Sequence, residues 1–170
     1  TEANLFYVDA GNNRIGIGTS TPQKPLNILA SGTELIRLSQ AVDASTQQEF
    51  GIGWAANDTH THPRAQITVK EFDASDSRGS LLFYTRGTNQ DVAPDERMRI
   101  DSSGRVLLGT TTEGHDNADD LTIATSGNTG ITLRSGTSSA GNIYFSDATS
   151  GNGEFDGYLS YAQSVNKMFF

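Results

Sequence analysis

The sequence predicts an all-β chain built from two tandem β-rich repeats, and three observations support this prediction. Leu, Ile, Val and Phe account for only 36 of the 170 residues, which is too few for a generous private core. Gly, Ser, Thr, Asn and Asp account for 78 residues, so turns and short strands must alternate quickly. The chain also matches itself over two long segments. Together these features exclude a protein of long helices.

The internal match begins near the amino terminus. Residues 6–22 (FYVDAGNNRIGIGTSTP) align with residues 98–113 (MRIDSSGRVLLGTTTE), with one extra residue in the first turn. The aligned pairs are Val8 and Ile100, Asp9 and Asp101, Arg14 and Arg105, Gly18 and Gly109, Leu26 and Leu121, Ile28 and Ile123, Ile36 and Ile131, Leu38 and Leu133, Ile52 and Ile143, and Trp54 and Phe145. We therefore expect a first repeat over residues 1–86, a polar connector over 87–96 and a second repeat over 97–170.

Strands are expected where apolar residues alternate between turns. Residues 14–18 (RIGIG) and 105–109 (RVLLG) each leave a turn and read as short strands. Residues 65–72 (AQITVKEF) and 141–147 (GNIYFSD) place every second apolar residue on one face. The turns contain Asn-Asn, Ser-Gly and Gly-Asn, which tolerate the positive φ that tight connections need.

One segment also fits a helix. Residues 33–49 space Leu35, Leu38 and Val42 like an amphipathic helix behind a Thr33 cap. The aligned segment in the second repeat contains Gly130 and β-branched neighbours, which disfavour a helix. We therefore predict a strand over residues 35–39 and leave residues 40–49 open.

Charge and cysteine content exclude several kinds of partner and of chemistry. The formal net charge is −8, and the Lys and Arg residues are scattered singly, so neither nucleic acid nor an anionic membrane is an expected partner. The chain has no cysteine, which excludes disulfides, thiolate metal sites and a thiol nucleophile. Because it begins at Thr1, we expect a processed product or a fragment of a longer protein.

The second repeat resembles a known class of module. Residues 96–112 (ERMRIDSSGRVLLGTTT), followed by GNIYFSD, GYLSY and MFF, are similar to the shaft repeats of bacteriophage tail fibres. Such repeats commonly precede an endosialidase-type intramolecular chaperone domain, which this sequence lacks. The first repeat carries the opening (RIGIGTSTP) and the closing strand (GSLLFYTR) of the same pattern.

The resemblance implies an elongated, intertwined homotrimeric fibre in the virion, outside the cell. It implies a structural module that positions host-receptor-binding elements, is not an enzyme and needs no cofactor. The expected partners are two further copies of the chain, other virion tail proteins and a host cell-surface glycan. One alternative is an adhesin that contacts surface polysaccharide directly, and a less favoured one is part of a capsule-depolymerising tailspike.

The sparse apolar content independently favours an oligomer. Three pairs of side chains are expected to meet their symmetry mates along an axis: Ile15 with Ile17, Val106 with Leu108, and Phe83 with Phe169. Gly16, Gly18 and Gly109 would let neighbouring backbones approach closely.

His60 and His62 form the one pattern with metal-ligand character. Residues two apart on a strand point to the same side, so three chains would supply six imidazoles around an axis. The pair lies in a polar loop without a counterpart in the second repeat, which favours solvated loop histidines. We assign no metal site.

No other residue is assigned a site. Glu154 and Asp156 are a weak carboxylate pair in a glycine-rich loop. Asp9 and Asp101 recur in both repeats, which favours a turn-forming role over catalysis. Residues 16–22 (GIGTSTP) lack the Lys-Ser/Thr ending of a phosphate-binding loop.

Arginines and aromatic residues are assigned to packing and ion pairs. We expect inter-chain salt bridges, or stems covering apolar surface, from Arg14, Arg99, Arg105 and Arg134. Packing is the preferred role over sugar stacking for Trp54, Tyr84, Tyr144, Tyr158 and Tyr161.

Overall fold

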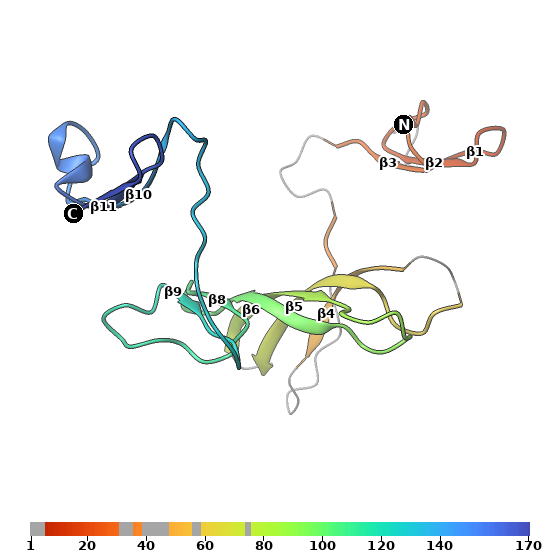
Figure 1. Ribbon diagram of the computed structural model, residues 1–170. Helices are drawn as coiled ribbons and strands as arrows, with labels where there is room; N and C mark the ends of the chain where they lie inside the picture. Colours follow the sequence, from red (N-terminus) through yellow and green to blue (C-terminus); the bar gives the residue numbers. More distant parts are fainter. Residues whose placement is uncertain (1–5, 31–35, 39–47, 56–58, 74–75) are drawn as a thin grey trace. The chain divides into compact units, whose positions relative to one another are not determined.

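The computed structural model is all-β, which confirms the predicted class (Figure 1). It describes residues 6–30, 36–38, 48–55, 59–73 and 76–170. The chain divides into two compact units, Thr1–Thr122 and Ile123–Phe170. The described strands form three sheets. No helix in the described part of the chain is long and apolar enough to span a membrane.

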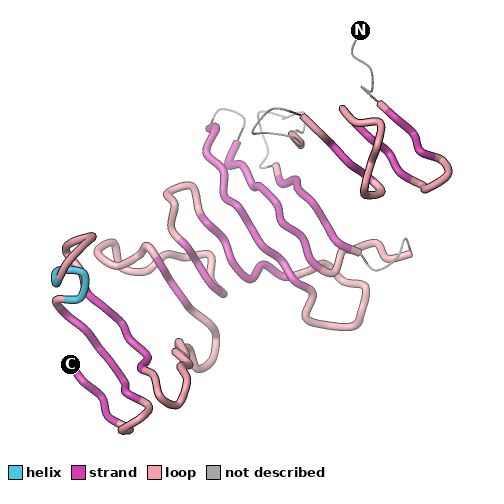
Figure 2. The backbone as a smooth tube through the Cα atoms, turned by 90° about the horizontal axis from the view of Figure 1, so that it is seen from above, coloured by secondary structure: helices cyan, strands magenta, loops and turns pink. Residues whose placement is uncertain are grey.

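The first sheet contains β1 (Tyr7–Asp9), β2 (Arg14–Ile17) and β3 (Leu26–Ile28), in that order (Figure 2). β1 is antiparallel to β2 across a tight turn, in which Asn13 has φ 54°. β2 and β3 are parallel, and the N–H of Ile15 donates to the carbonyl of Pro25 at 2.8 Å. The predicted strand RIGIG is thus confirmed as the centre of this sheet.

The second sheet has six strands in sequence order: β4 (Glu49–Trp54), β5 (Ala65–Asp73), β6 (Asp76–Thr85), β7 (Asp95–Ile100), β8 (Val106–Leu108) and β9 (Leu121–Ile123). The pairs from β4 to β8 are antiparallel. The predicted strands AQITVKEF and RVLLG are confirmed as β5 and β8. β7 begins at Asp95, inside the segment predicted as the connector.

The third sheet contains β10 (Ala140–Phe145), β11 (Gly157–Ala162) and β12 (Lys167–Phe169), all antiparallel. A short 3₁₀ helix, η1 (Asn152–Phe155), lies in the loop between β10 and β11. The predicted strand GNIYFSD is confirmed as β10 up to Phe145.

Aligned residues of the two repeats occupy matching places. Val8 lies opposite Ile15, and the aligned Ile100 lies opposite Val106. The N–H of Val106 donates to the carbonyl of Asp120 at 2.8 Å, as that of Ile15 does to Pro25. The ranges of β4 and β10 also coincide in the alignment. The self-match therefore predicts backbone pairing as well as residue type.

The strand predicted over residues 35–39 is wrong where the structure describes it. Residues 36–38 form neither strand nor helix, and 35 and 39 lie outside the described residues, as do 40–47 of the open segment. The aligned residues 131–133 are also outside any strand. Ile36 and Ile131 are 58% and 64% exposed, and Leu38 and Leu133 are both 48% exposed. Alternation is present in both repeats, but no described strand of the chain pairs with either segment.

The buried apolar core is very small. Among the described residues, only Leu82 and Leu107 are buried large apolar side chains, whereas 26 others are exposed. The strand register places Arg99 between Leu82 and Leu107, so all three share one face of the six-stranded sheet. The expectation that the chain lacks a generous core of its own is confirmed for a single copy.

Replacing Gly18 with Ala should destabilise the chain strongly. Gly18 has φ +74°, and a Cβ there would lie 2.0 Å from the carbonyl oxygen of Leu29. The positive φ alone costs about 1–2 kcal/mol, and the contact forces the backbone apart. Gly104 is the control, because it has φ +86° with no atom near its Cβ position. Thermal unfolding should show a clearly larger loss for Gly18→Ala than for Gly104→Ala, and equal losses would contradict the close-approach argument.

Candidate functional site

The widest apolar surface lies on one face of the six-stranded sheet. Residues directly opposite one another on paired strands point to the same face, so the strand register defines rows of side chains. One row contains Ile52, Ile67, Phe83, Met98 and Leu108. The next row on that face contains Phe50, Val69, Leu81, Ile100 and Val106. We call these two rows the apolar face.

Within the unit Thr1–Thr122, no described strand forms a second layer against the apolar face. Each of its side chains is exposed or half-buried, and none is fully buried. A sheet with one apolar face normally buries that face against another layer. Exposed apolar rows of this extent mark an interaction surface. The expected axial residues Val106, Leu108 and Phe83 all belong to it.

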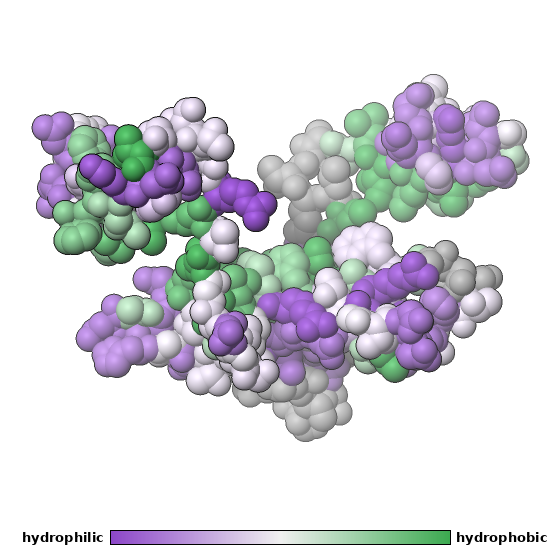
Figure 3. Space-filling view, viewed as in Figure 1, coloured by the Kyte–Doolittle hydropathy of each residue, from purple (hydrophilic) through white to green (hydrophobic). Residues whose placement is uncertain are grey.

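The first sheet repeats this arrangement on a smaller scale. Val8, Ile15 and Leu26 lie opposite one another, and Ile17 lies opposite Ile28 on the same face. Figure 3 shows this sheet at the upper right, hydrophobic on one side and hydrophilic on the other. Of the expected axial residues, Ile15 and Ile17 therefore stand on an apolar face. Neither is buried within the chain.

The third sheet divides its apolar residues between its two faces. Ile143 lies opposite Leu159, and Tyr161 lies opposite Met168, which places these four on one face. Phe169 lies opposite Ser160, on the other face, so it does not occupy the position equivalent to Phe83. A shift of one residue reverses the face of a strand side chain, and the alternation alone did not settle this register.

The opposite face of the six-stranded sheet holds the buried Leu82 and Leu107 among polar side chains that pair within the chain. Thr68 donates to Glu49 at 2.8 Å, and Arg99 forms two hydrogen bonds of 2.6 Å with Glu96. Burial and a hydrogen bond with Glu49 raise the pKa of Tyr84 above its ordinary range. Tyr84 is therefore a packing residue, as expected, and its phenol is engaged within the chain.

A bulge explains the pairing of Glu96 with Arg99. Residues three apart on a regular strand point to opposite faces. The register between β6 and β7 shifts at Phe83 and Tyr84, so Glu96 lies opposite Tyr84 while Arg99 lies opposite Leu82. Since Leu82 and Tyr84 share a face, the bulge brings the carboxylate and the guanidinium together.

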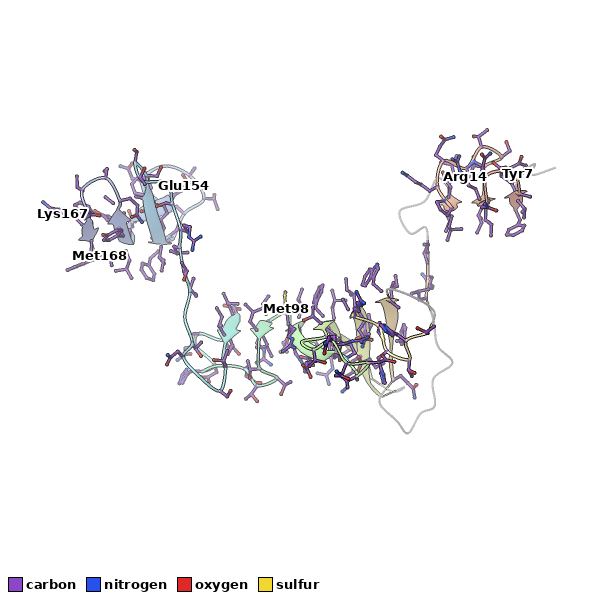
Figure 4. The ribbon with its side chains drawn as sticks, turned by 45° about the vertical axis from the view of Figure 1, so that its right-hand side comes forward. Tyr7, Arg14, Met98, Glu154, Lys167 and Met168 are labelled. Atoms are coloured by element: carbon purple, nitrogen blue, oxygen red, sulfur yellow. The ribbon has the colours of Figure 1, made fainter. Side chains whose placement is uncertain are left out.

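Arg99 and Arg105 form ion pairs within the chain, and their expected inter-chain salt bridges stay a prediction. Arg105 contacts Asp101 and Asp119 at 2.8 Å each. In the first repeat the aligned Arg14 donates to the carbonyl of Pro22 at 2.8 Å (Figure 4). Arg14 thus holds the connection that follows β2, and Arg105, directly before β8, holds the connection that follows β8. Arg134 is exposed.

Asp9 and Asp101 each accept backbone hydrogen bonds from the turn that follows them, as predicted. The carboxylate of Asp9 accepts from the N–H of Asn12, and that of Asp101 accepts from Ser103 and Arg105. Partial burial acts to raise the pKa of Asp101, but its hydrogen bonds with Arg105 and Ser103 outweigh this and lower the pKa. The aspartates position the strands.

His60 and His62 lie in the loop that precedes β5. His62 Nδ1 is 3.7 Å from the carboxylate of Asp91. The Nδ1 atoms of His60 and His62 are buried without a hydrogen-bond partner in the described chain, so fully solvated loop histidines are an incomplete description. No group of three or more His, Cys, Asp or Glu among the described residues could hold a metal ion. A site shared by three chains stays a hypothesis.

The remaining candidates lie apart from these groups. Glu154 lies in η1, Asp156 follows it, and both are exposed. In the GIGTSTP segment, Thr19 accepts from the N–H of Thr21, which makes a turn. Trp54 is exposed at the end of β4.

Sequence reasoning missed two cavities. One lies at the end of the six-stranded sheet beside Arg86, and the other lies beside Tyr144 and Tyr158 in the third sheet. The only sequence signals were the histidine pair and the aromatic residues. Comparison with known proteins adds no assignment, because no family model and no curated protein matches the chain.

Replacing Asp101 with Asn should destabilise more than Asp9→Asn. Both variants keep an oxygen for the turn, but only Asp101 also holds Arg105. We expect an added loss of about 1.5–3 kcal/mol, the range for hydrogen bonds to charged groups. Chemical denaturation at neutral pH measures the free energy of unfolding of both variants. Equal losses would show that the contact between Asp101 and Arg105 contributes nothing to stability.

The same aspartate should contribute to acid sensitivity. Because the folded pKa of Asp101 is lowered, its stabilisation is present above the unfolded pKa of about 3.9 and is lost as the pH falls through the folded pKa. Unfolding of the Asn variant should therefore depend less steeply on pH below about 4. An Asn variant whose unfolding depends on pH below about 4 as steeply as that of the wild type would contradict this assignment.

Proposed function

We propose that this chain is a structural, non-enzymatic module of a homotrimeric bacteriophage tail-fibre shaft, which carries and positions host-receptor-binding elements. The apolar face is the observation that carries the proposal. Its rows cross five strands, and no described strand of the unit Thr1–Thr122 forms a layer against them. Cyclic association of identical chains would cover the same surface on every copy.

Two aligned segments outside the strands, residues 36–38 and 131–133, support association between chains. Ile36 with Leu38, and Ile131 with Leu133, alternate like strand residues in both repeats but remain exposed. Exposed apolar side chains gain burial when neighbouring chains cover them. The same arrangement at aligned places in both repeats favours a shared use in assembly.

The joint between the repeats suits a shaft. β6 closes the first repeat, β7 opens the second, and the two are paired from Leu81 to Ile100 at one end and from Thr85 to Asp95 at the other. The strands of successive repeats thus form a single sheet across the joint. Stacked units that contact mainly their neighbours give an elongated structure.

The oligomeric state tests this proposal. Native mass spectrometry and light scattering of the full chain should show a trimer. The double variant Ile52→Lys and Ile143→Lys places charge on exposed apolar positions in both repeats and should reduce the trimer strongly. Thr149→Lys, on an exposed loop, is the control and should remain trimeric. A stable, folded wild-type monomer would refute the shaft role.

A second candidate function is direct binding of a surface saccharide. A cavity of about 280 Å³ in the third sheet is lined by Asn142, Tyr144, Phe155, Tyr158 and Ser160. The rings of Tyr144 and Phe155 are 6.2 Å apart at an angle of 52°. Aromatic faces beside amide and hydroxyl groups suit a sugar ring, which has apolar faces and hydroxyl edges.

A glycan array separates the two functions. The adhesin role predicts specific binding by the wild-type chain that Tyr158→Ala abolishes, while Tyr7→Ala, on β1 and outside the cavity, leaves it intact. Loss of binding in both variants would point away from the cavity. Absence of any binding by the wild type would remove this second candidate and leave the shaft role unaffected.

A further inference from the structure

A basic cavity lies at one end of the six-stranded sheet. The loop before β5 and the loop after β6 meet at this end, because Trp54 lies opposite Ala65 and Ala65 lies opposite Thr85. The cavity has a volume of about 420 Å³. Its lining consists of His60, Arg64, Arg86, Gly87, Thr88 and Asn89. Three of these six residues carry basic side chains, and none carries a carboxylate.

Arg86 is built into the wall of the cavity. Its side chain is only 4% exposed. Its guanidinium donates to the carbonyls of His62, Pro63 and Gln90, which ties the two loops together. Nε of Arg86 is nevertheless buried without a partner among the described residues. A buried charged donor in this state is costly unless something else accepts from it.

Further donors line the same cavity. Arg64 is exposed and has no acidic partner in the described part of the chain. The Thr88 hydroxyl accepts from the N–H of Gln90, which leaves its own proton to donate. The Asn89 side-chain oxygen accepts from Gln90, which leaves the amide N–H groups. The available groups are therefore mainly donors.

The nearest carboxylate does not neutralise the cavity. Asp91 is 3.5 Å from Arg86 and accepts from the N–H groups of Thr61 and His62. These N–H groups, and the charges of His60 and Arg86, lower the pKa of Asp91 although desolvation opposes them. Asp91 balances Arg86, and no carboxylate among the described residues balances Arg64. This excess positive charge stands out in a chain of net charge −8.

We propose that this cavity binds an oxyanion, a carboxylate or phosphate group of a larger ligand. Arginine side chains and short polar donors match the geometry and charge of such a group. The corresponding loop of the second repeat, between β10 and β11, carries Asp147, Glu154 and Asp156 and no basic residue. The basic loop before β5 therefore has no basic counterpart in the second repeat, and the proposed site does not depend on the shaft role.

The test is calorimetric titration of the full chain with three probes: sodium glucuronate, inorganic phosphate and glucose. Glucuronate and glucose differ by the carboxylate, and phosphate separates a free anion from an acidic sugar. Binding of glucuronate or phosphate, but not glucose, is expected. Arg64→Gln should weaken it about tenfold, the loss expected for one charge-assisted hydrogen bond.

Two controls keep the result interpretable. Arg134→Gln removes an exposed arginine elsewhere and should bind as the wild type does. Thermal unfolding should show that Arg64→Gln is folded, because the Arg64 side chain makes no ion pair in the described chain. No binding of either anion, equal binding of glucose and glucuronate, or unchanged affinity in Arg64→Gln would each overturn the proposal.

Discussion

The uncovered apolar face is the constraint on which the rest of the structure depends. A single sheet buries side chains only where another layer covers it, and the described chain contributes only Leu82 and Leu107 to a fully buried apolar core. Hydrophobic burial is the main favourable term in folding. A chain that leaves most of this term unrealised needs a partner surface, and the proposed association of identical chains would supply one.

Within the chain, polar contacts position the strands. In the proposed assembly, most burial of apolar side chains comes from contacts between chains. The turns at Asp9 and Asp101 set the register of the strands on either side, and Arg14 and Arg105 each anchor the connection that follows. A net hydrogen bond contributes only about 0.5–1.5 kcal/mol. Such contacts select one arrangement of short strands, but they cannot replace a covered sheet face.

The sequence predicted what depends on short-range pattern. Alternation located the strands around Ile15 and Val106, and the self-match placed aligned residues correctly in both repeats. The sequence pattern did not predict that residues 36–38 lie outside any strand, because alternation does not show whether a pairing strand is present. The face of Phe169 and the bulge beside Glu96 depend on single-residue register. Arg86 gave no signal, because its acceptors are backbone carbonyls, which any residue can supply.

The two repeats also provide a comparison within one chain. Positions that match across them, such as Ile52 with Ile143 and Gly18 with Gly109, determine strand pairing, turns or exposed apolar surface. The residues of the basic cavity match nothing in the second repeat, whose loop is acidic. A feature needed for every unit of a shaft must recur, whereas a ligand site needs to occur only once. Under the two proposals, recurrence separates assembly from recognition: the sheet faces serve assembly, and the loops at the end of the six-stranded sheet serve recognition.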